Sequence, residues 1–187
     1  MKIIEHNKWI VEYDDHLTRK IYKSLTGGPE DCICGNCKNF LLARENFYPD
    51  DFKKVLNQLG IDSKKETEIF QSYRVKPGWH LYQGWFHFVG NILKSPQVDH
   101  NTIYEQVPFY KGWFRFIGNI LKGPQVDLKS SQADFESIYY QVPEFKNFGW
   151  TFSTNKDLIS DAFEQNPVVQ LEWIGLVPWV IDSPEPS

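Results

Sequence analysis

The sequence has little cysteine, and the distribution of that cysteine excludes a fold held together by disulfides. The 187 residues contain three cysteines, an odd number, and all three lie between Cys32 and Cys37. Small secreted folds spread their cysteines to connect distant segments, whereas clustered thiols are typical of a reducing compartment. The opening residues and the most apolar stretch, 168–181, are interrupted by polar residues, so neither predicts a secretory signal or a membrane span. We therefore expect a cytoplasmic protein.

A strong charge of either sign is also missing. Twenty Lys and Arg residues stand against 24 Asp and Glu residues, which gives a net charge of −4. This field is too weak to hold a polyanion, so nucleic acid and anionic membranes are poor candidates as partners. Phosphate-binding glycine loops, Gly-x-Ser-x-Gly and His-Glu-x-x-His are absent from the sequence as well. Because no pattern supplies a nucleophile with a base, we expect a non-enzymatic binding or scaffold protein with a protein partner.

Aromatic residues are abundant and favour a sheet. They make up 16% of the chain, with 14 Phe, 9 Tyr and 7 Trp, and flat rings suit the half-buried surface of a strand. Helical periodicity dominates residues 1–67, and Gly, Pro and aromatic residues recur in residues 68–182. This order predicts a single α+β domain over residues 1–187, with N-terminal helices packed on a mainly antiparallel sheet. The polar, Pro-rich tail 183–187 is expected to be frayed.

The N-terminal half gives specific expectations for individual elements. Lys2–Tyr13 alternates loosely and predicts an opening strand, after which Asp14 or Asp15 can cap a helix. A short helix is expected over residues 38–46, and a clearer one over residues 49–59, with Gly60 placed for a left-handed C-terminal cap. Ser63 and Glu66 have the spacing of a capping box, which predicts one more short helix.

A tandem repeat marks the C-terminal half. Gly84–Asp99 and Gly112–Asp127 match at thirteen of sixteen positions, which predicts a duplicated β-hairpin that widens one sheet. Within the strand the copies differ at His87/Arg115 and at a Val/Ile pair, which share one face, whereas the phenylalanines on the other face are unchanged. We therefore expect the phenylalanine face to be the packed one. The hairpin also lengthens a sheet edge, which favours pairing with a second copy of the chain as a homodimer.

The cysteine cluster is the segment with the clearest chemistry. Cys32, Cys34 and Cys37 are separated by two and three positions beside a glycine, so their thiolates can converge on one soft cation, most often zinc. A tetrahedral ion needs a fourth ligand, which can be a histidine, a carboxylate, water or a residue of another chain. We take His87 as the first candidate and His80 as the second, and the pattern around His87 is equally that of a buried core histidine. Such a closed site would be structural. Three ordinary reduced thiols are the alternative.

A redox function is a further alternative for the same segment. Cys34 and Cys37 have the two-residue spacing of a thioredoxin-type dithiol, and the helix expected after them would stabilise a thiolate. In a thiol-disulfide oxidoreductase of this kind, Cys34 would attack and Cys37 would resolve. The motif is usually preceded by a buried strand, whereas here a helix and a Gly-Gly-Pro loop precede it.

Several motifs together resemble a group of uncharacterised bacterial proteins of similar size. They are Cys-x-Cys-x-x-Cys-x-Asn-Phe at 32–40, Gly-Trp-Phe-His-Phe-Val-Gly at 84–90, Pro-Val-Val-Gln-Leu-Glu at 167–172 and Val-Pro-Trp-Val at 177–180. The resemblance implies no known activity. The group contains the Gly-Trp-Phe-His strand once, so the second copy with Arg115 is a departure from its pattern.

Overall fold

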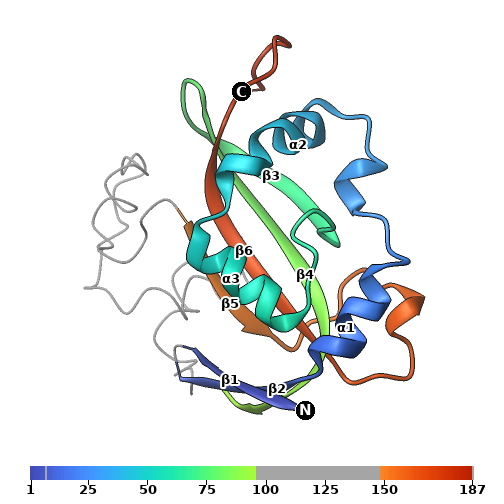
Figure 1. Cartoon of the computed structure of the whole chain (residues 1–187). Coiled ribbons are helices and arrows are strands. Elements are labelled where there is room, and N and C mark those ends of the chain that lie inside the picture. The colour runs from blue at the N-terminus through green and yellow to red at the C-terminus, as the bar shows by residue number, and fades with distance from the viewer. Residues whose placement is uncertain (7, 96–147, 187) are drawn as a thin grey trace, which may run out of the picture.

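The computed structural model describes residues 1–6, 8–95 and 148–186, which form three α-helices and a six-stranded sheet (Figure 1). The α+β class predicted from the sequence is therefore confirmed, and every strand pair in this part of the chain is antiparallel. In chain order the elements are β1 (Lys2–His6), β2 (Trp9–Tyr13), α1 (Asp15–Tyr22), the short 3-10 helix η1 (Gly28–Glu30), α2 (Gly35–Phe47), α3 (Asp50–Leu59), β3 (Glu68–Lys76), β4 (Trp79–Lys94), β5 (Phe148–Ser153), the 3-10 helix η2 (Asp161–Phe163) and β6 (Val168–Pro178).

The sheet is organised around β4, a strand of 16 residues. One edge of β4 pairs with β3 and, nearer its C-terminal end, with β2, while the other edge pairs with β6. The strand order is β1-β2-β4-β6-β5, with β3 beside β4 (Figure 1). Residues 84–94, predicted as a strand, lie within β4. The second copy of the repeat, Gly112–Asp127, and the turn that follows the first copy lie outside the described residues.

Both faces of β4 are covered, which corrects the expectation that only its phenylalanine face is packed. Phe86 and Phe88 are fully buried, and so is His87 between them. On the phenylalanine side, Phe52 of α3 lies 6.5 Å from Phe86 between ring centroids. On the histidine side, Phe163 of η2 lies 6.2 Å from the His87 ring. Where a central strand is covered on both faces, it buries side chains of both parities, as residues 86–89 of β4 do.

The helices form where their local signals predict, with two corrections nearby. The side chain of Asp14 accepts a hydrogen bond of 2.9 Å from the Leu17 N–H and caps α1. Gly60 ends α3 in the left-handed conformation, with φ +82°. The stretch Lys2–Tyr13 is a hairpin of two strands rather than one strand. No helix forms at Ser63–Glu66, because the Glu66 carboxylate is used in a buried ion pair described below.

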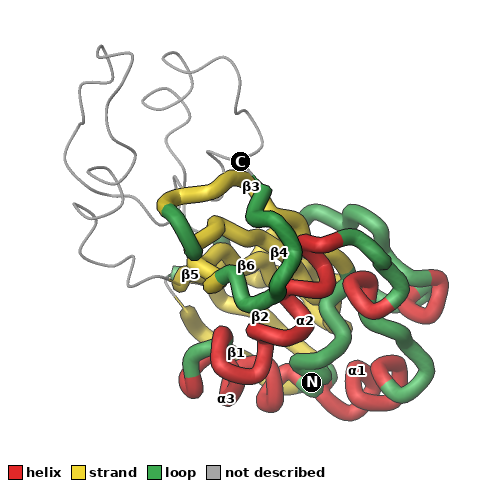
Figure 2. Tube along the Cα trace, turned by 90° about the horizontal axis from the view of Figure 1, so that it is seen from above, coloured by secondary structure: helices red, strands yellow, loops and turns green. Residues whose placement is uncertain are grey.

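An aromatic cluster joins α2 and the residue after it to the sheet. Phe40 stacks on Trp173 of β6 at 5.4 Å between ring centroids, and the rings of Phe47 and Tyr48 contact the same tryptophan at 5.2 and 5.4 Å. Figures 1 and 2 show α2 and α3 on one side of β4 and β6. This cluster fixes the position of α2, and therefore of the cysteines at its N-terminal end.

Candidate metal centre

The three cysteines converge at the start of α2. The sulfur atoms of Cys32, Cys34 and Cys37 all lie within 4.8 Å of one another, and none of them is in a disulfide. In a tetrahedral zinc-thiolate site, Zn–S bonds of ~2.3 Å place the sulfurs roughly 3.8 Å apart, so a small contraction suffices to bind an ion. Three thiols at this separation can hold a soft metal ion. The convergence predicted from their spacing is present.

The loop that carries the cysteines is tied to the chain that leads into β3. The Gly28 N–H donates a hydrogen bond of 2.8 Å to the Glu66 carbonyl oxygen, and a Cβ at Gly28 would clash with the carbonyl oxygen of Thr67. The η1 turn follows, and the Cys32 N–H donates to the Pro29 carbonyl at 3.3 Å. This close approach needs a glycine, because no side chain fits between the two backbones.

The three thiols have different environments. Cys34 is exposed and occupies the N-cap of α2, where its sulfur accepts a hydrogen bond of 3.4 Å from the Cys37 N–H. Burial acts to raise the pKa of Cys34, but hydrogen bonds from the Cys37 N–H, the two neighbouring thiols and the Asn36 N–H outweigh it, and the pKa is lowered. Cys37 is buried, and burial together with the other two thiols raises its pKa. Cys34 is therefore more readily deprotonated than Cys37.

Polar side chains of the sheet hold the first turn of α2 in place. The Tyr82 hydroxyl in β4 donates to the Asn36 carbonyl at 3.1 Å, and the Asn36 amide donates to the Gln71 side chain in β3 at 3.1 Å. The fully buried Asn39 donates to the Pro178 carbonyl at 3.0 Å and accepts from the Val180 N–H at 2.6 Å. Sequence reasoning did not assign these residues a role, because their partners are far away in the chain.

His87, the first candidate for the fourth ligand, is not part of the cluster of three cysteines. It is fully buried in β4, outside the cluster of three. Its Nδ1 lies 3.2 Å from the Thr67 hydroxyl, and its Nε2 lies 3.0 Å from the side-chain oxygen of Gln170 in β6. Burial lowers the pKa of His87 to about 4. The ring is thus a neutral core histidine with both nitrogens hydrogen-bonded.

His80, the second candidate, also lies outside the cluster. Its Nδ1 is 2.8 Å from the Gln71 side-chain amide, and its Nε2 is 2.9 Å from a carboxylate oxygen of Glu185. Glu185 also accepts from the Gly78 N–H at 2.6 Å and pairs with Arg74 at 3.1 Å. These contacts hold Glu185 against β3, β4 and the turn between them, within the tail that the sequence predicts to be frayed.

Glu66 is a buried carboxylate beside the cysteine loop, and its role differs from the capping box that the sequence predicts. Glu66 is fully buried and pairs with Arg44 of α2 at 2.9 Å, while the Tyr48 hydroxyl donates to it at 2.9 Å. Burial raises the pKa of Glu66, against the opposing effect of the Arg44 charge. Its spacing from Ser63 suggested a capping box, and no local pattern indicates a pairing with α2.

Comparison with protein-family models, with curated proteins and with solved structures finds no match to this chain. The resemblance to a bacterial group therefore stays a prediction. None of the helices in the described ranges is long and apolar enough to cross a membrane. The chemistry and geometry of the cysteine cluster are the basis for assigning a function.

Proposed function

We propose that this protein is a cytoplasmic, non-enzymatic binding protein that holds a zinc ion through Cys32, Cys34 and Cys37. The observation that carries the proposal is the convergence of the three sulfur atoms within 4.8 Å. Thiolates are soft ligands that select zinc among the common divalent ions, and zinc accepts them in tetrahedral geometry. When bound, the ion supplies a cross-link between the loop and α2.

A structural role for the ion is supported by the position of the loop. Between α1 and α2 the chain has only the short η1 turn of three residues as regular structure. A metal bound by Cys32 ahead of the helix and by Cys37 within its first turns would fix the direction in which the chain enters α2. Because unfolded chains seldom preform such a site, metal binding would stabilise the fold.

Cobalt(II) substitution tests the metal site directly. We expect the metal-free protein to bind one cobalt ion per chain with intense thiolate charge-transfer absorption and the visible bands of tetrahedral coordination. The Cys37→Ser variant should lose most of this absorption. Ile33→Ser is the matched control, because Ile33 lies in the same loop, is 86% exposed and offers no ligand. Absence of the charge-transfer bands from the unmodified protein would refute the proposal.

Thiol-disulfide exchange is a second candidate, favoured by the exposure of Cys34 and the burial of Cys37 at the first turn of α2. The Cys34 thiolate would attack a substrate disulfide and displace one substrate sulfur as a thiolate. The Cys37 thiolate would then attack the Cys34 sulfur and release the second substrate thiolate. Two electrons pass from the cysteine pair to the substrate, which leaves a Cys34–Cys37 disulfide.

A trapping experiment separates this candidate from the metal site. Metal-free protein is incubated with a small aromatic disulfide, and the products are weighed by intact mass spectrometry. Because Cys32 is also within reach of Cys34, the trapping variant carries both Cys32→Ser and Cys37→Ser. Exchange predicts that this variant accumulates a mixed disulfide on Cys34, whereas the unmodified chain proceeds to an internal disulfide. If the unmodified chain also stops at the mixed disulfide, Cys37 does not resolve it and this candidate fails.

A binding protein also needs a partner. We propose that it is a protein, and that a second copy of this chain is the first to test. β1 and β5 lie at the two ends of the strand order, so each has one unpaired backbone edge among the described strands. Sedimentation velocity over a range of concentrations decides whether the chain self-associates. A single species with the mass of one chain at every concentration would exclude a homodimer.

A further inference from the structure

We infer that the fourth coordination position of the proposed zinc ion receives a histidine side chain from a different protein, and that the apolar residues beside this histidine occupy a groove on α2. The inference rests on the proposed metal site and adds the chemistry of the partner. The first observation is the number of ligands in the cysteine cluster. Within residues 1–6, 8–95 and 148–186 the cluster contains three ligands, and a tetrahedral zinc ion takes four.

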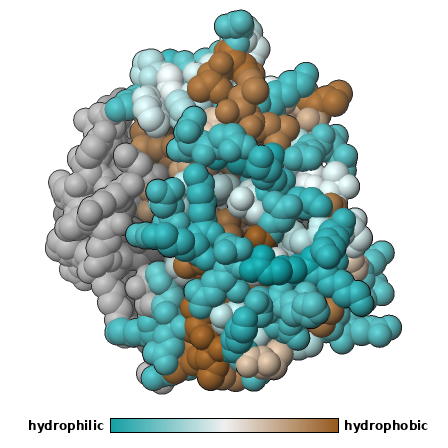
Figure 3. Space-filling view, in the orientation of Figure 1, coloured by the Kyte–Doolittle hydropathy of each residue, from teal (hydrophilic) through white to brown (hydrophobic). Residues whose placement is uncertain are grey.

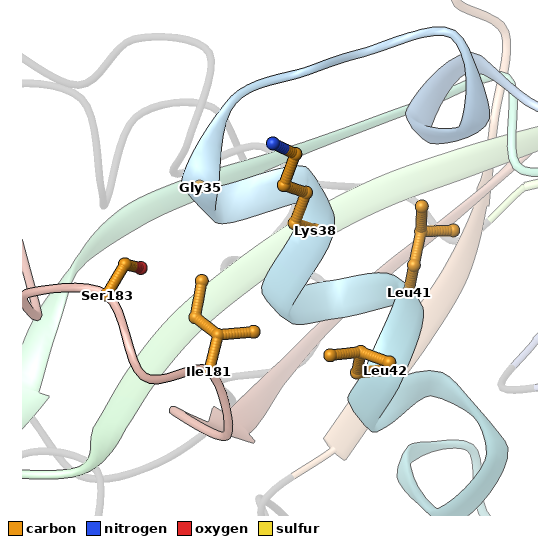
Figure 4. A pocket seen from close by; sticks show the side chains of 6 residues that line it. All are labelled: Gly35, Lys38, Leu41, Leu42, Ile181 and Ser183. Carbon is orange, nitrogen blue, oxygen red and sulfur yellow. The ribbon is translucent and has the colours of Figure 1, made fainter.

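The groove lies beside the first turns of α2. It has a volume of about 670 Å³ and opens broadly to solvent. Figure 4 shows Leu42 of α2 and Ile181 of the segment after β6 pointing toward each other across it. Its lining residues are Gly35, Lys38, Leu41, Leu42, Ile181 and Ser183.

Apolar side chains in the groove and in the segments next to it in the chain are exposed. Leu42 is 66% exposed, Val180 in the segment after β6 is 49% exposed, and Ile33 in the cysteine loop is 86% exposed. Figure 3 shows hydrophobic surface gathered at the top of the molecule, over the region where Figure 1 places the start of α2 and the end of β6. Burying such side chains against a partner stabilises a complex by roughly 25 cal/mol per Å² of apolar area, before the cost of association.

The groove and the metal cluster share the same turn of helix. Gly35, at one end of the groove, directly follows the exposed Cys34, and Lys38 follows Cys37. Lys38 and Leu42 are four residues apart and therefore lie on one face of α2. A peptide that places a donor at the metal would have its next residues over this face.

Charge favours histidine as the donor. A zinc ion with three thiolates carries a net charge of −1, and a fourth thiolate or a carboxylate would raise it to −2. Asp31 precedes the cluster directly and adds negative charge, whereas Glu30 is paired with Arg44 at 3.0 Å, and Lys38 is the one cation among the lining residues. A neutral imidazole adds no charge. Both ring nitrogens of His80 and of His87 have hydrogen-bond partners, so ligation by either residue would break at least one of these bonds.

The test uses the full chain loaded with cobalt(II) and three probes. The probes are free imidazole, a short synthetic peptide with a central histidine flanked by leucines, and the same peptide with alanine in place of the histidine. Ligand binding is followed through the visible bands of the cobalt ion and through the fluorescence anisotropy of labelled peptide. We expect imidazole to shift the cobalt bands and the histidine peptide to do so with at least tenfold higher affinity. The alanine peptide should bind weakly and leave the bands unchanged.

Two variants separate the groove from the metal. Leu42→Asp should reduce the affinity for the histidine peptide at least tenfold and leave cobalt binding and the imidazole response as they are. Leu158→Asp is the matched control, because Leu158 is also 66% exposed but lies after β5, away from the groove. Leu158→Asp should leave the peptide affinity, cobalt binding and the imidazole response unchanged.

Several results would overturn the inference. Cobalt bands that do not respond to imidazole would mean that the fourth position is already filled by this chain. Equal affinity for the histidine peptide and for free imidazole would show that the groove does not contribute to binding. An equal effect of Leu42→Asp and Leu158→Asp on the peptide affinity would show the same. Metal-dependent dimerisation would assign the position to a second copy. If cobalt does not bind at all, the proposed metal site itself fails, and this result is distinguishable from the others because it precedes every ligand titration.

Discussion

Replacement of His87 by glutamine should change how the stability of the protein depends on pH. His87 is fully buried, and its tautomer follows from its partners. The Gln170 amide donates to Glu172 at 2.8 Å, so its oxygen faces the imidazole and Nε2 of His87 must carry the proton. Nδ1 then accepts from the Thr67 hydroxyl. The hydrogen-bond partners of His87 therefore stabilise the neutral imidazole.

The size of the effect follows from the pKa of His87. Burial lowers this pKa from 6.5 to about 4, and such a shift corresponds to about 3 kcal/mol of stability. In the unfolded chain the imidazole takes up a proton below pH 6.5, whereas in the folded chain it does so only near pH 4. The unfolded state therefore binds more protons within this window. As a result, the folded state is destabilised as the pH falls from 6.5 to 4.

Urea unfolding at several pH values across this window measures the effect. His87→Gln should be less stable than the unmodified protein near neutral pH, because packing and hydrogen bonds are lost. Its disadvantage should shrink by about 3 kcal/mol toward pH 4, because glutamine takes up no proton. The control is His16→Gln, since His16 is exposed on α1. Parallel stability curves for His87→Gln and the unmodified protein would refute the reasoning, and loss of the metal in His87→Gln would restore His87 as a ligand.

Three further substitutions test the contacts around the site. Arg44→Met should lower the free energy of unfolding by about 3–5 kcal/mol at neutral pH, because it leaves the buried Glu66 carboxylate without its cation. Burial already raises the pKa of Glu66, so the loss should be smaller in acid, and a pH-independent loss in urea unfolding would contradict this. Glu185→Gln should weaken three contacts of the C-terminal tail and speed its removal by carboxypeptidase, and unchanged digestion would show that these contacts do not hold it. Gly60→Ala should cost more than about 1 kcal/mol in thermal unfolding, because φ is +82° and a Cβ would clash with the Asp15 carbonyl. An unchanged melting temperature would contradict it.

Local sequence signals predicted those parts of the fold that depend on near neighbours. The helix over residues 49–59 and its cap at Gly60 follow from a stripe of apolar residues and one glycine, and the structure has both. The cysteine cluster was found for the same reason, because its three ligands lie within six residues of sequence. Three ligands at this spacing need only one loop to converge.

The surroundings of β4 could not be read from the sequence. Alternation in a strand distinguishes two faces only when one of them meets solvent, and β4 is covered on both. His87 was therefore taken as available for a metal when it is a core residue. Glu66 was misassigned for a related reason, since its partner Arg44 lies 22 positions earlier. Contacts over such distances depend on how α2 packs, which no short pattern records.

Metal analysis of the native protein tests the central claim most directly. The full chain, purified without an affinity tag and without chelators, is measured by native mass spectrometry and by elemental analysis of the same sample. We predict one zinc ion per chain, its loss in Cys37→Ser and its retention in His87→Gln. Less than about a tenth of an equivalent of any metal in the unmodified protein, with all three thiols free, would contradict the claim.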